Sequence, residues 1–193
     1  MKDSETFRKI NVIEKQIISA SLSRISPLFL PILNEIEKFL FIKLSNQRSH
    51  IIYPNLYLFS EELHDLFQNL KTHADIISGG TNFGFIKKGE FYISLECAEY
   101  FYKKGTLLDF KHIRLSEKGE KSILYGNNIT KNMYTTLPIN LKKKDFLVVF
   151  NDSREIIAIA QSLVDTTNIQ NLRPKDIVAI NLCDKGYYLR RNQ

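Results

Sequence analysis

The sequence predicts an α+β protein in two parts, a mixed N-terminal domain over residues 1–107 and a small β barrel over residues 108–193. A length of 193 residues is enough for two small domains. The first part alternates strand-like runs with stretches whose apolar residues recur at helical spacing. The second part holds short β-prone runs separated by turn-forming residues, which is typical of a small barrel.

The N-terminal segment predicts a helix over residues 4–22. Ser4 is a suitable N-cap, and Pro27 marks a stop beyond the helix. Residues 27–44 are strongly apolar and fit either a helix or, from Phe39 onward, a strand; we favour the helix. The apolar face of the first helix would be formed by Phe7, Ile10, Ile13, Ile17 and either Ile18 or Ala20.

The rest of the first domain is predicted to form a strand, a helix, a hairpin and a second helix. The strand covers residues 51–59, and Ser60 begins a helix with acidic residues in its first turn. The hairpin turns at residues 87–89, where a glycine permits a positive φ. The second helix begins at residue 94 or 95 and ends at Lys103, with Gly105 just beyond it. The hairpin strands are expected at residues 82–86 and 90–95.

The strands of the predicted barrel lie between turns rich in Asn, Asp, Gly and Pro. These turns fall at residues 126–128, 151–152, 173–176 and 184–186. The boundary with the first domain is expected near residues 105–109, where the pattern changes. The strands are expected at residues 110–115, 133–137, 146–150, 156–163, 177–182 and 187–190.

Positive charge is concentrated in the second domain. Residues 1–107 carry 13 Lys and Arg against 12 Asp and Glu, a net charge of +1, whereas residues 108–193 carry 14 against 9, a net charge of +5. Such asymmetry indicates a polyanionic partner for the C-terminal domain. An ordinary solvated surface with a modest basic bias explains the charge equally well, so charge alone leaves both interpretations open.

The sequence argues against membrane and metal-dependent classes. No apolar run reaches the ~18 residues that a membrane-spanning helix needs, and the charged N-terminus does not resemble a secretory signal. Cys97 and Cys183 could form a disulfide, but we favour two buried, reduced thiols in an intracellular protein. Neither cysteine has a second Cys or a His at ligand spacing, and the four histidines show no metal spacing, so we expect no metal and no cofactor.

Several stretches, in order along the chain, resemble one family. This is the archaeal and eukaryotic large-subunit ribosome biogenesis family named from "nuclear import protein seven", whose members carry a C-terminal PUA domain. Glu120-Lys121-Ser122-Ile123-Leu124-Tyr125-Gly126-Asn127-Asn128-Ile129-Thr130-Lys131 resembles the stretch that opens that domain. Residues 80–91 resemble the glycine-punctuated hairpin of the family, and residues 146–150, 177–180 and 184–191 resemble its closing strands.

The resemblance covers roughly residues 50–191 and implies an N-terminal α/β domain with an antiparallel sheet, followed by a PUA-type β pseudobarrel. It implies RNA binding by the barrel and contacts of the first domain with ribosome assembly or RNA-processing proteins. Since no membrane-spanning run is present, we expect no membrane partner. The chain departs from the family before about residue 50. It also departs at Ile157-Ala158-Ile159-Ala160, where many PUA domains have glycines.

Cations in the barrel are the candidate RNA-binding residues, because Arg and Lys bind phosphates. The alternative is that these residues are solubilising edge charges. Lys142, Lys143 and Lys144 are expected to form a solvated turn. One of Tyr187 and Tyr188 could stack on a base, although core packing is expected for at least one. The candidate residues are Lys131, Arg173, Lys175, Lys185, Arg190 and Arg191.

We expect a non-catalytic RNA-binding factor that assists large-subunit biogenesis and pre-rRNA processing, monomeric outside its complex. Its location would be the cytoplasm of an archaeon or the nucleolus of a eukaryote. One alternative is a protein-interaction adaptor with a structural barrel. Another is a small RNA-modifying enzyme or nuclease, although no catalytic motif is visible in the sequence.

Overall fold

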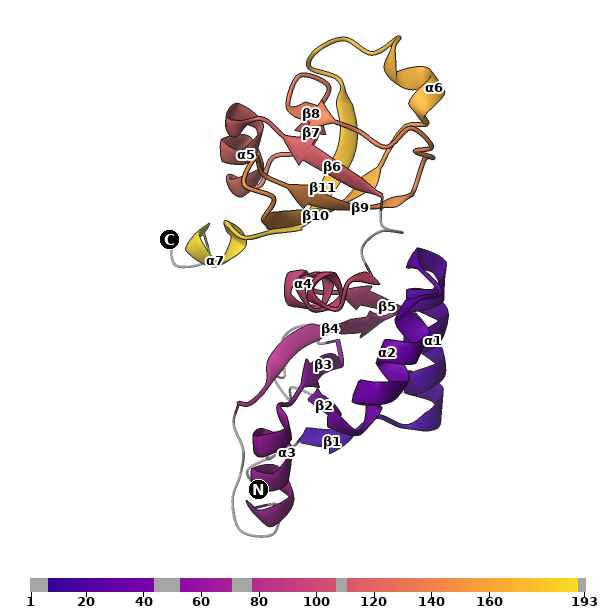
Figure 1. The fold of residues 1–193 in the computed structure, drawn as a ribbon, viewed down its shortest axis with the longest axis vertical. Helices are drawn as coiled ribbons and strands as arrows, with labels where there is room; N and C mark the ends of the chain where they lie inside the picture. Colours follow the sequence, from indigo (N-terminus) through magenta and orange to yellow (C-terminus); the bar gives the residue numbers. More distant parts are fainter. Residues whose placement is uncertain (1–6, 44–52, 71–77, 107–110, 191–193) are drawn as a thin grey trace. The chain divides into compact units, whose positions relative to one another are not determined.

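The structure is a computed structural model that describes residues 7–43, 53–70, 78–106 and 111–190. The chain divides into two compact units, residues 1–101 and 102–193. The boundary predicted between residues 107 and 108 lies outside the described residues and stays a prediction. Each unit combines helices with its own sheet (Figure 1), which confirms the predicted α+β class.

Within the described residues, the first unit forms a five-stranded antiparallel sheet with the order β1-β2-β3-β4-β5. Helices α1 and α2 lie together beside the strands, and α3 lies near β1 (Figure 1). The strands are β1 (Phe7–Lys9), β2 (Leu40–Lys43), β3 (Asn55–Leu58), β4 (Thr81–Lys87) and β5 (Glu90–Ile93). The helices are α1 (Val12–Ile25), α2 (Phe29–Ile36), the 3-10 helix η1 (Glu37–Phe39), α3 (Glu61–Leu70) and α4 (Leu95–Lys103).

The helix predicted over residues 4–22 is wrong in its first part, because β1 precedes it. Phe7 pairs with Lys43 across β1 and β2 and is only 4% exposed. Asn11 then caps α1: its side-chain oxygen accepts a hydrogen bond from the Glu14 N–H at 2.8 Å, and the Glu14 carboxylate accepts one from the Asn11 N–H at 2.9 Å. This reciprocal capping box starts the helix directly after the strand.

The buried face of α1 also differs from the predicted one. Val12 and Ile13 are 72% and 67% exposed, whereas Ile18 and Leu22 are fully buried. The predicted cap, Ser4, lies outside the described residues. The helix therefore buries its C-terminal half, and its first turn faces solvent.

Residues 27–44 contain both a helix and a strand, the two structures that their sequence pattern allows. Helix α2 ends at Ile36, η1 follows it and ends at Phe39, and β2 begins at Leu40. The favoured helix is therefore wrong beyond residue 39. Leu40, Phe41 and Ile42 are each at most 1% exposed, and such a continuous apolar run suits a strand that is covered on both faces.

The remaining predictions for the first unit are confirmed where the structure describes them. The predicted strand over residues 51–59 is β3, although residues 51 and 52 lie outside the described residues. The Ser60 hydroxyl accepts a hydrogen bond from the Leu63 N–H at 3.2 Å and so caps α3. The predicted hairpin is β4–β5, and the helix that follows it is α4.

Helices pack on both faces of this sheet: α2 and α4 on one face, and α3 on the other. On one face, Phe29 of α2 stacks on Phe101 of α4 with 4.1 Å between ring centroids, and Phe83 contacts the same ring. On the other face, Phe67 of α3 packs on Phe7 and Phe41 at the β1 end. Aromatic burial of this size supplies much of the stabilising apolar area of the unit.

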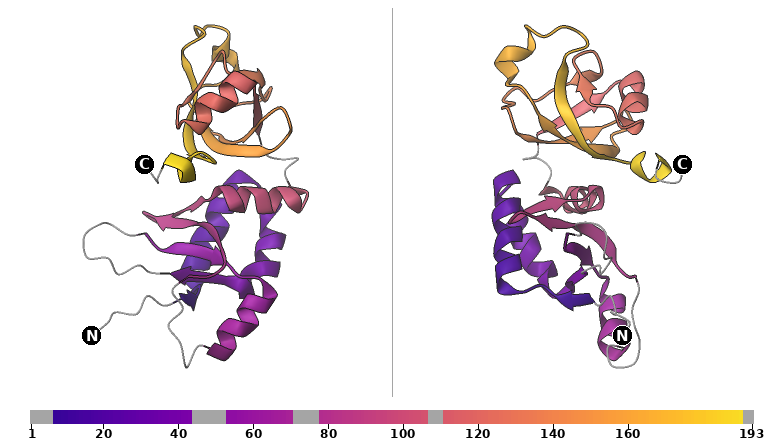
Figure 2. Two further views of the ribbon diagram at one scale, coloured as in Figure 1. Left: turned by 90° about the vertical axis from the view of Figure 1, so that its left-hand side faces the viewer. Right: turned by 180° about the vertical axis from the view of Figure 1, so that it is seen from behind.

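The described part of the second unit is a six-stranded sheet, ordered β7-β11-β10-β9-β6-β8, that curls into a barrel (Figure 2). The β6–β9 pair is parallel and the other pairs are antiparallel. The strands are β6 (His112–Leu115), β7 (Ile129–Thr130), β8 (Tyr134–Thr136), β9 (Phe146–Phe150), β10 (Ile156–Ser162) and β11 (Ile177–Asp184). The helices are α5 (Glu117–Leu124), α6 (Thr166–Ile169) and α7 (Tyr187–Arg190).

The core of the barrel is centred on β10. Ala158 and Ala160 are fully buried there, and their small side chains let α5 and neighbouring strands approach closely. These are the positions at which the sequence departs from a glycine pattern. Alanine is therefore accommodated at both of them.

Two local predictions for the second unit need correction. The strand predicted over residues 187–190 is wrong, because these residues form the short helix α7. The prediction also contains no helix at residues 117–124, where α5 lies. Ser116 caps α5 by accepting a hydrogen bond from the Gly119 N–H at 3.2 Å. The five other predicted strands correspond to β6, β8, β9, β10 and β11.

Candidate functional site

The turn that follows α5 is fixed against β11 by polar contacts. The Gly126 N–H donates to the Ile123 carbonyl at 2.8 Å, which closes the helix end. The side-chain oxygen of Asn128 then accepts a hydrogen bond from the Asn181 N–H at 3.1 Å. Residues 126–128, one of the turns predicted from the sequence, are therefore held beside the second half of β11.

Arg190 is bound inside this unit, contrary to its expected position on an RNA-binding surface. Its guanidinium donates hydrogen bonds to both carboxylate oxygens of Asp184, at 3.0 and 2.9 Å, and a further one to the Leu124 carbonyl. Asp184 is only 3% exposed. A buried carboxylate needs a cationic partner to offset its lost hydration, and these bonds raise the pKa of Arg190 above its ordinary value.

The Arg190 contact joins the end of α5 to the end of β11. Gly186 allows this close approach, because a Cβ atom at that position would collide with the Leu124 carbonyl. The Asn181 side chain adds a bond of 2.9 Å to Asp184 and one of 3.3 Å to the Ile123 carbonyl. Arg190 therefore acts as a positioning residue for this end of the barrel.

Three of the predicted cations are brought together at the opposite end of β11. The Lys131 N–H donates to the Asp176 carbonyl at 3.1 Å, and the next N–H in the chain donates to the Pro174 carbonyl at 3.0 Å. These main-chain bonds place Lys131 beside the turn that carries Arg173 and Lys175. We call Lys131, Arg173 and Lys175 the basic cluster.

Members of the basic cluster differ in how firmly they are held. The Lys131 ammonium donates to the carbonyls of Gln170 at 3.1 Å and Leu172 at 2.7 Å, so two of its three N–H groups are directed inward. The Arg173 side chain is 87% exposed and lies 3.4 Å from the Asp176 carboxylate. Such an exposed pair contributes little stability, so a phosphate can compete for this guanidinium.

The six predicted residues therefore do not form one compact site. The basic cluster precedes β11, whereas Lys185 and Arg190 follow it. At about 3.3 Å per residue, the eight residues of β11 separate the two groups by roughly 25 Å. Lys185 is exposed. Arg191 lies outside the described residues.

Sequence reasoning missed one exposed aromatic side chain at this surface. Tyr125 is the C-cap residue directly after α5. It precedes the 126–128 turn and is 77% exposed. The sequence feature that could have identified it is an aromatic residue directly before Gly126-Asn127-Asn128, a turn at the end of a helix. Tyr187 is also exposed, at 47%. Tyr188, the other residue considered for stacking, has a side chain outside the described set.

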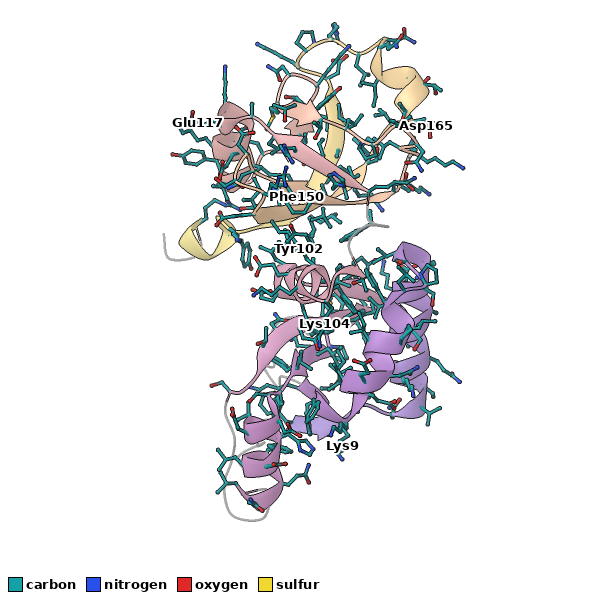
Figure 3. The ribbon with its side chains drawn as sticks, in the orientation of Figure 1. Lys9, Tyr102, Lys104, Glu117, Phe150 and Asp165 are labelled. Carbon is teal, nitrogen blue, oxygen red and sulfur yellow. The ribbon has the colours of Figure 1, made fainter. Side chains whose placement is uncertain are left out.

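The three adjacent lysines form a separate basic segment. The Lys143 N–H donates to the Asp165 carboxylate at 2.9 Å, and the Lys144 N–H donates to the Ser162 carbonyl at 2.8 Å. Asp165 and Glu117 of α5 lie on opposite sides of the barrel (Figure 3). The side chains of residues 142–144 are exposed, as expected for a solvated turn.

The described ranges contain no group of three or more His, Cys, Asp or Glu side chains placed to hold a metal ion. They also contain no helix that is long and apolar enough to cross a membrane. Cys97 is buried, Cys183 is half-buried, and neither is in a disulfide. Burial raises the pKa of the Cys97 thiol well above its ordinary value.

Comparisons with solved structures identify the fold. The chain is similar to a hypothetical protein of Pyrococcus horikoshii, with a TM-score of 0.60 and 11% identity over 93% of this chain and 94% of the other. It is also similar to a conserved PUA domain protein of Thermoplasma acidophilum, with a TM-score of 0.53 and 14% identity over 97% and 99% of the two chains. At these identities the likeness shows the fold alone.

Comparisons of sequence find a matching domain and a similar protein. Residues 111–193 match the family model described as the UPF0113 PUA domain. The chain is also 27% identical, over 136 residues, to a Dictyostelium discoideum protein named "60S ribosome subunit biogenesis protein NIP7 homolog", covering 70% of this chain and 73% of that protein. These comparisons confirm the resemblance noted in the sequence: the C-terminal unit matches the UPF0113 PUA domain, and the chain is similar to a NIP7 homologue.

Proposed function

We propose that this protein is a non-catalytic RNA-binding factor in the biogenesis of the large ribosomal subunit. The similarity to the Dictyostelium relative and the name of that relative support the biogenesis role. The PUA domain and the positive charge of residues 108–193 support RNA as the ligand. The RNA would be ribosomal or pre-ribosomal, met in the nucleolus of a eukaryote or the cytoplasm of an archaeon.

The main support for this proposal is the basic cluster and its position beside β11. Main-chain hydrogen bonds from Lys131 and its neighbour hold together two segments that are more than 40 residues apart in the sequence. Three cations are thereby presented at one end of the strand. Phosphate contacts from such residues position an RNA strand on the protein.

The rest of the proposed surface lies along β11. We define the β11 surface as the basic cluster together with Tyr125, residues 126–128 and Lys185. Tyr125 offers a ring on which an unpaired base can stack. The main-chain amides of the 126–128 turn and the Lys185 ammonium would contact further phosphates. Arg190 is excluded from direct contact because its guanidinium is already bonded to Asp184.

The proposal is tested by reversing charge in the basic cluster. In the full chain, Arg173→Glu combined with Lys175→Glu should weaken binding of a fluorescent single-stranded RNA at least ten-fold, measured by anisotropy. The dependence of affinity on salt should also become shallower, because fewer counterions are released when fewer phosphates are bound. A matched control combines Lys142→Glu with Lys143→Glu, which changes the net charge equally on the segment beside Asp165. Equal weakening by both variants would show that only net charge matters and would reject the β11 surface.

Absence of catalysis is the second part of the proposal. Incubation of RNA with the full chain and Mg²⁺, followed by mass analysis, should return the RNA unchanged. Cleavage or a mass increment would instead support the small nuclease or RNA-modifying enzyme considered from the sequence.

An adaptor role is the second candidate function, favoured by the first turn of α1. Val12 and Ile13 lie side by side in the sequence and are 72% and 67% exposed. Exposed neighbouring apolar side chains are typical of protein contact sites. If Val12→Ser combined with Ile13→Ser removes a protein from assembly complexes while RNA affinity is unchanged, the first unit carries this additional role.

A further inference from the structure

The first unit carries a row of aromatic side chains on the sheet face that, within the described residues, α3 covers at the β1 end. Phe85 of β4 pairs directly with Tyr92 of β5 and with Asn55 of β3, so the three side chains lie on one face. Tyr53, just before β3, lies against Phe85. We call Tyr53, Phe85 and Tyr92 the aromatic row.

The opposite face of the same strands is closed. Leu56 and Ile93 are the neighbours of Gly84 on the two adjacent strands, and they are 0% and 6% exposed. A Cβ atom at Gly84 would collide with the Tyr92 carbonyl and lie 2.8 Å from the Phe91 ring. Strands β4 and β5 are therefore tightly joined, and this fixes the spacing of the side chains that they present on the other face.

Within the aromatic row, Phe85 and Tyr92 are nearly parallel and offset, whereas Tyr53 is tilted against Phe85. The centroids of Phe85 and Tyr92 are 5.3 Å apart with 8° between the planes, and those of Tyr53 and Phe85 are 5.8 Å apart with 31° between the planes. Parallel rings in contact are about 3.5–4 Å apart, so a centroid distance of 5.3 Å requires a sideways offset of several ångströms. Neighbouring rings of the row therefore cover each other only in part; Tyr53 and Phe85 are half-buried, and Tyr92 is 40% exposed.

Charge around the aromatic row favours an anionic ligand. The Lys87 ammonium lies 4.8 Å from the centroid of the Tyr53 ring, and Lys88 in the hairpin turn is exposed. The nearby carboxylate of Glu90 is already engaged: it accepts hydrogen bonds from Arg24 at 2.9 Å and from the Tyr92 hydroxyl at 3.2 Å. Within the described residues, Lys87 and Lys88 therefore place positive charge beside the rings.

We propose that the aromatic row binds single-stranded RNA, with a base stacked on Tyr92 or Phe85 and the backbone phosphate near Lys87 and Lys88. Aromatic rings on a sheet face, flanked by cations, provide the two interactions that unpaired RNA requires. This site lies in the first unit, separate from the β11 surface of the second. The chain would thus hold RNA at two places, which goes beyond the function proposed for the PUA domain.

A tryptophan reporter tests the stacking directly, because the chain contains no tryptophan. Tyr92→Trp keeps an aromatic ring in the row and introduces a unique indole fluorophore. Single-stranded RNA should quench the indole emission of the full-length variant, whereas an RNA duplex of the same length should not. Emission that is unchanged at saturating RNA, or quenched equally by duplex, would overturn the proposal.

Affinity measurements provide the second arm. Tyr92→Ala should weaken binding of single-stranded RNA roughly 5- to 150-fold, the range for loss of one base–aromatic stack, and Tyr92→Phe should restore it. Tyr102→Ala is the control, because Tyr102 is also 40% exposed but lies at the end of α4, at the start of the second unit. Equal affinities of the Tyr92→Ala and Tyr102→Ala variants would reject the site.

The failure of this inference is distinguishable from failure of the PUA proposal. Indole quenching reports only on the first unit, whereas Arg173→Glu combined with Lys175→Glu alters only the second. If quenching persists in the chain that also carries both charge reversals, the aromatic row binds RNA independently. If quenching is absent while the charge reversals still weaken binding, the aromatic row is rejected and the β11 surface stands.

Discussion

Arg190 forms a two-pronged ion pair with Asp184 across the end of the barrel, with N–O distances of 3.0 and 2.9 Å. Two hydrogen bonds between a guanidinium and a carboxylate fix both position and orientation. We expect Arg190→Ala to lower the thermal midpoint of the second unit, because the buried Asp184 carboxylate then loses its cation. Arg190→Lys should recover only part of the loss, and Arg154→Ala, an exposed control, should leave the midpoint unchanged. Differential scanning calorimetry would measure all three.

Substitution of Gly186 should destabilise the same region by a steric route. Gly186→Ala places a methyl group against the Leu124 carbonyl, and overpacking of this kind costs about 1–3 kcal/mol. The free energy of unfolding from urea titration gives the cost. Lys185→Ala is the neighbouring control. A Gly186→Ala variant as stable as the unmodified chain would show that α5 and β11 are not closely joined.

Stability at acidic pH should depend on Glu14. The hydrogen bond from Arg8 holds the pKa of the Glu14 carboxyl below its ordinary value. A depressed pKa in the folded state means that the carboxylate stabilises the fold above its unfolded pKa of about 4.3. That contribution is lost as the pH falls through the lower, folded-state pKa. Urea midpoints of the unmodified chain and Glu14→Gln should therefore differ at neutral pH and converge below pH ~4; Glu62→Gln is the exposed control.

Reactivity of the cysteines should follow their burial. Cys97 is buried and its pKa is raised, so the thiol stays protonated and covered at neutral pH. A chromogenic disulfide reagent should modify Cys97 only as fast as the unit opens, while Cys183 is modified earlier. Peptide mapping after a timed reaction distinguishes the two. Faster labelling of Cys97 than of Cys183 in the folded chain would contradict the packing around α4.

Tyr125 should contribute to RNA binding without contributing to stability. Its ring is 77% exposed beside the 126–128 turn, so Tyr125→Ala removes a stacking platform and little buried area. We expect the affinity for single-stranded RNA to fall roughly 5- to 150-fold at an unchanged thermal midpoint. Tyr125→Phe should bind as the unmodified chain does. Loss of affinity in both variants would indicate that the hydroxyl group, and not the ring, makes the contact.

Elements with a strong, continuous pattern could be predicted from the sequence, whereas short elements could not. The strands that became β9 and β10 are long apolar runs between clear turns. Helix α5 was missed because Gly119 interrupts a short segment of low apolar content, and glycine is a weak helix former. Tyr187 and Tyr188 favour strands by propensity, but they follow Gly186 at a helix start.

Residue types at the candidate site could be predicted, but their grouping could not. Lys131 joins Arg173 because β7 pairs with β11, a contact between segments far apart in the sequence. Arg190 is withdrawn from the surface because Asp184 is buried next to it. Burial of one acid depends on the three-dimensional packing of α5, β10 and β11, and no local pattern in the sequence encodes it.

The position of β11 between β7 and β10 has a consequence for synthesis of the protein. Of the described strands, β11 comes last in the chain, yet it lies inside the sheet. Until it leaves the ribosome tunnel, β7 has no partner and β10 has an unpaired edge that can associate with other nascent chains. The barrel therefore cannot fold gradually as it is translated, and the cell must keep it from aggregating until nearly all of the domain has been made.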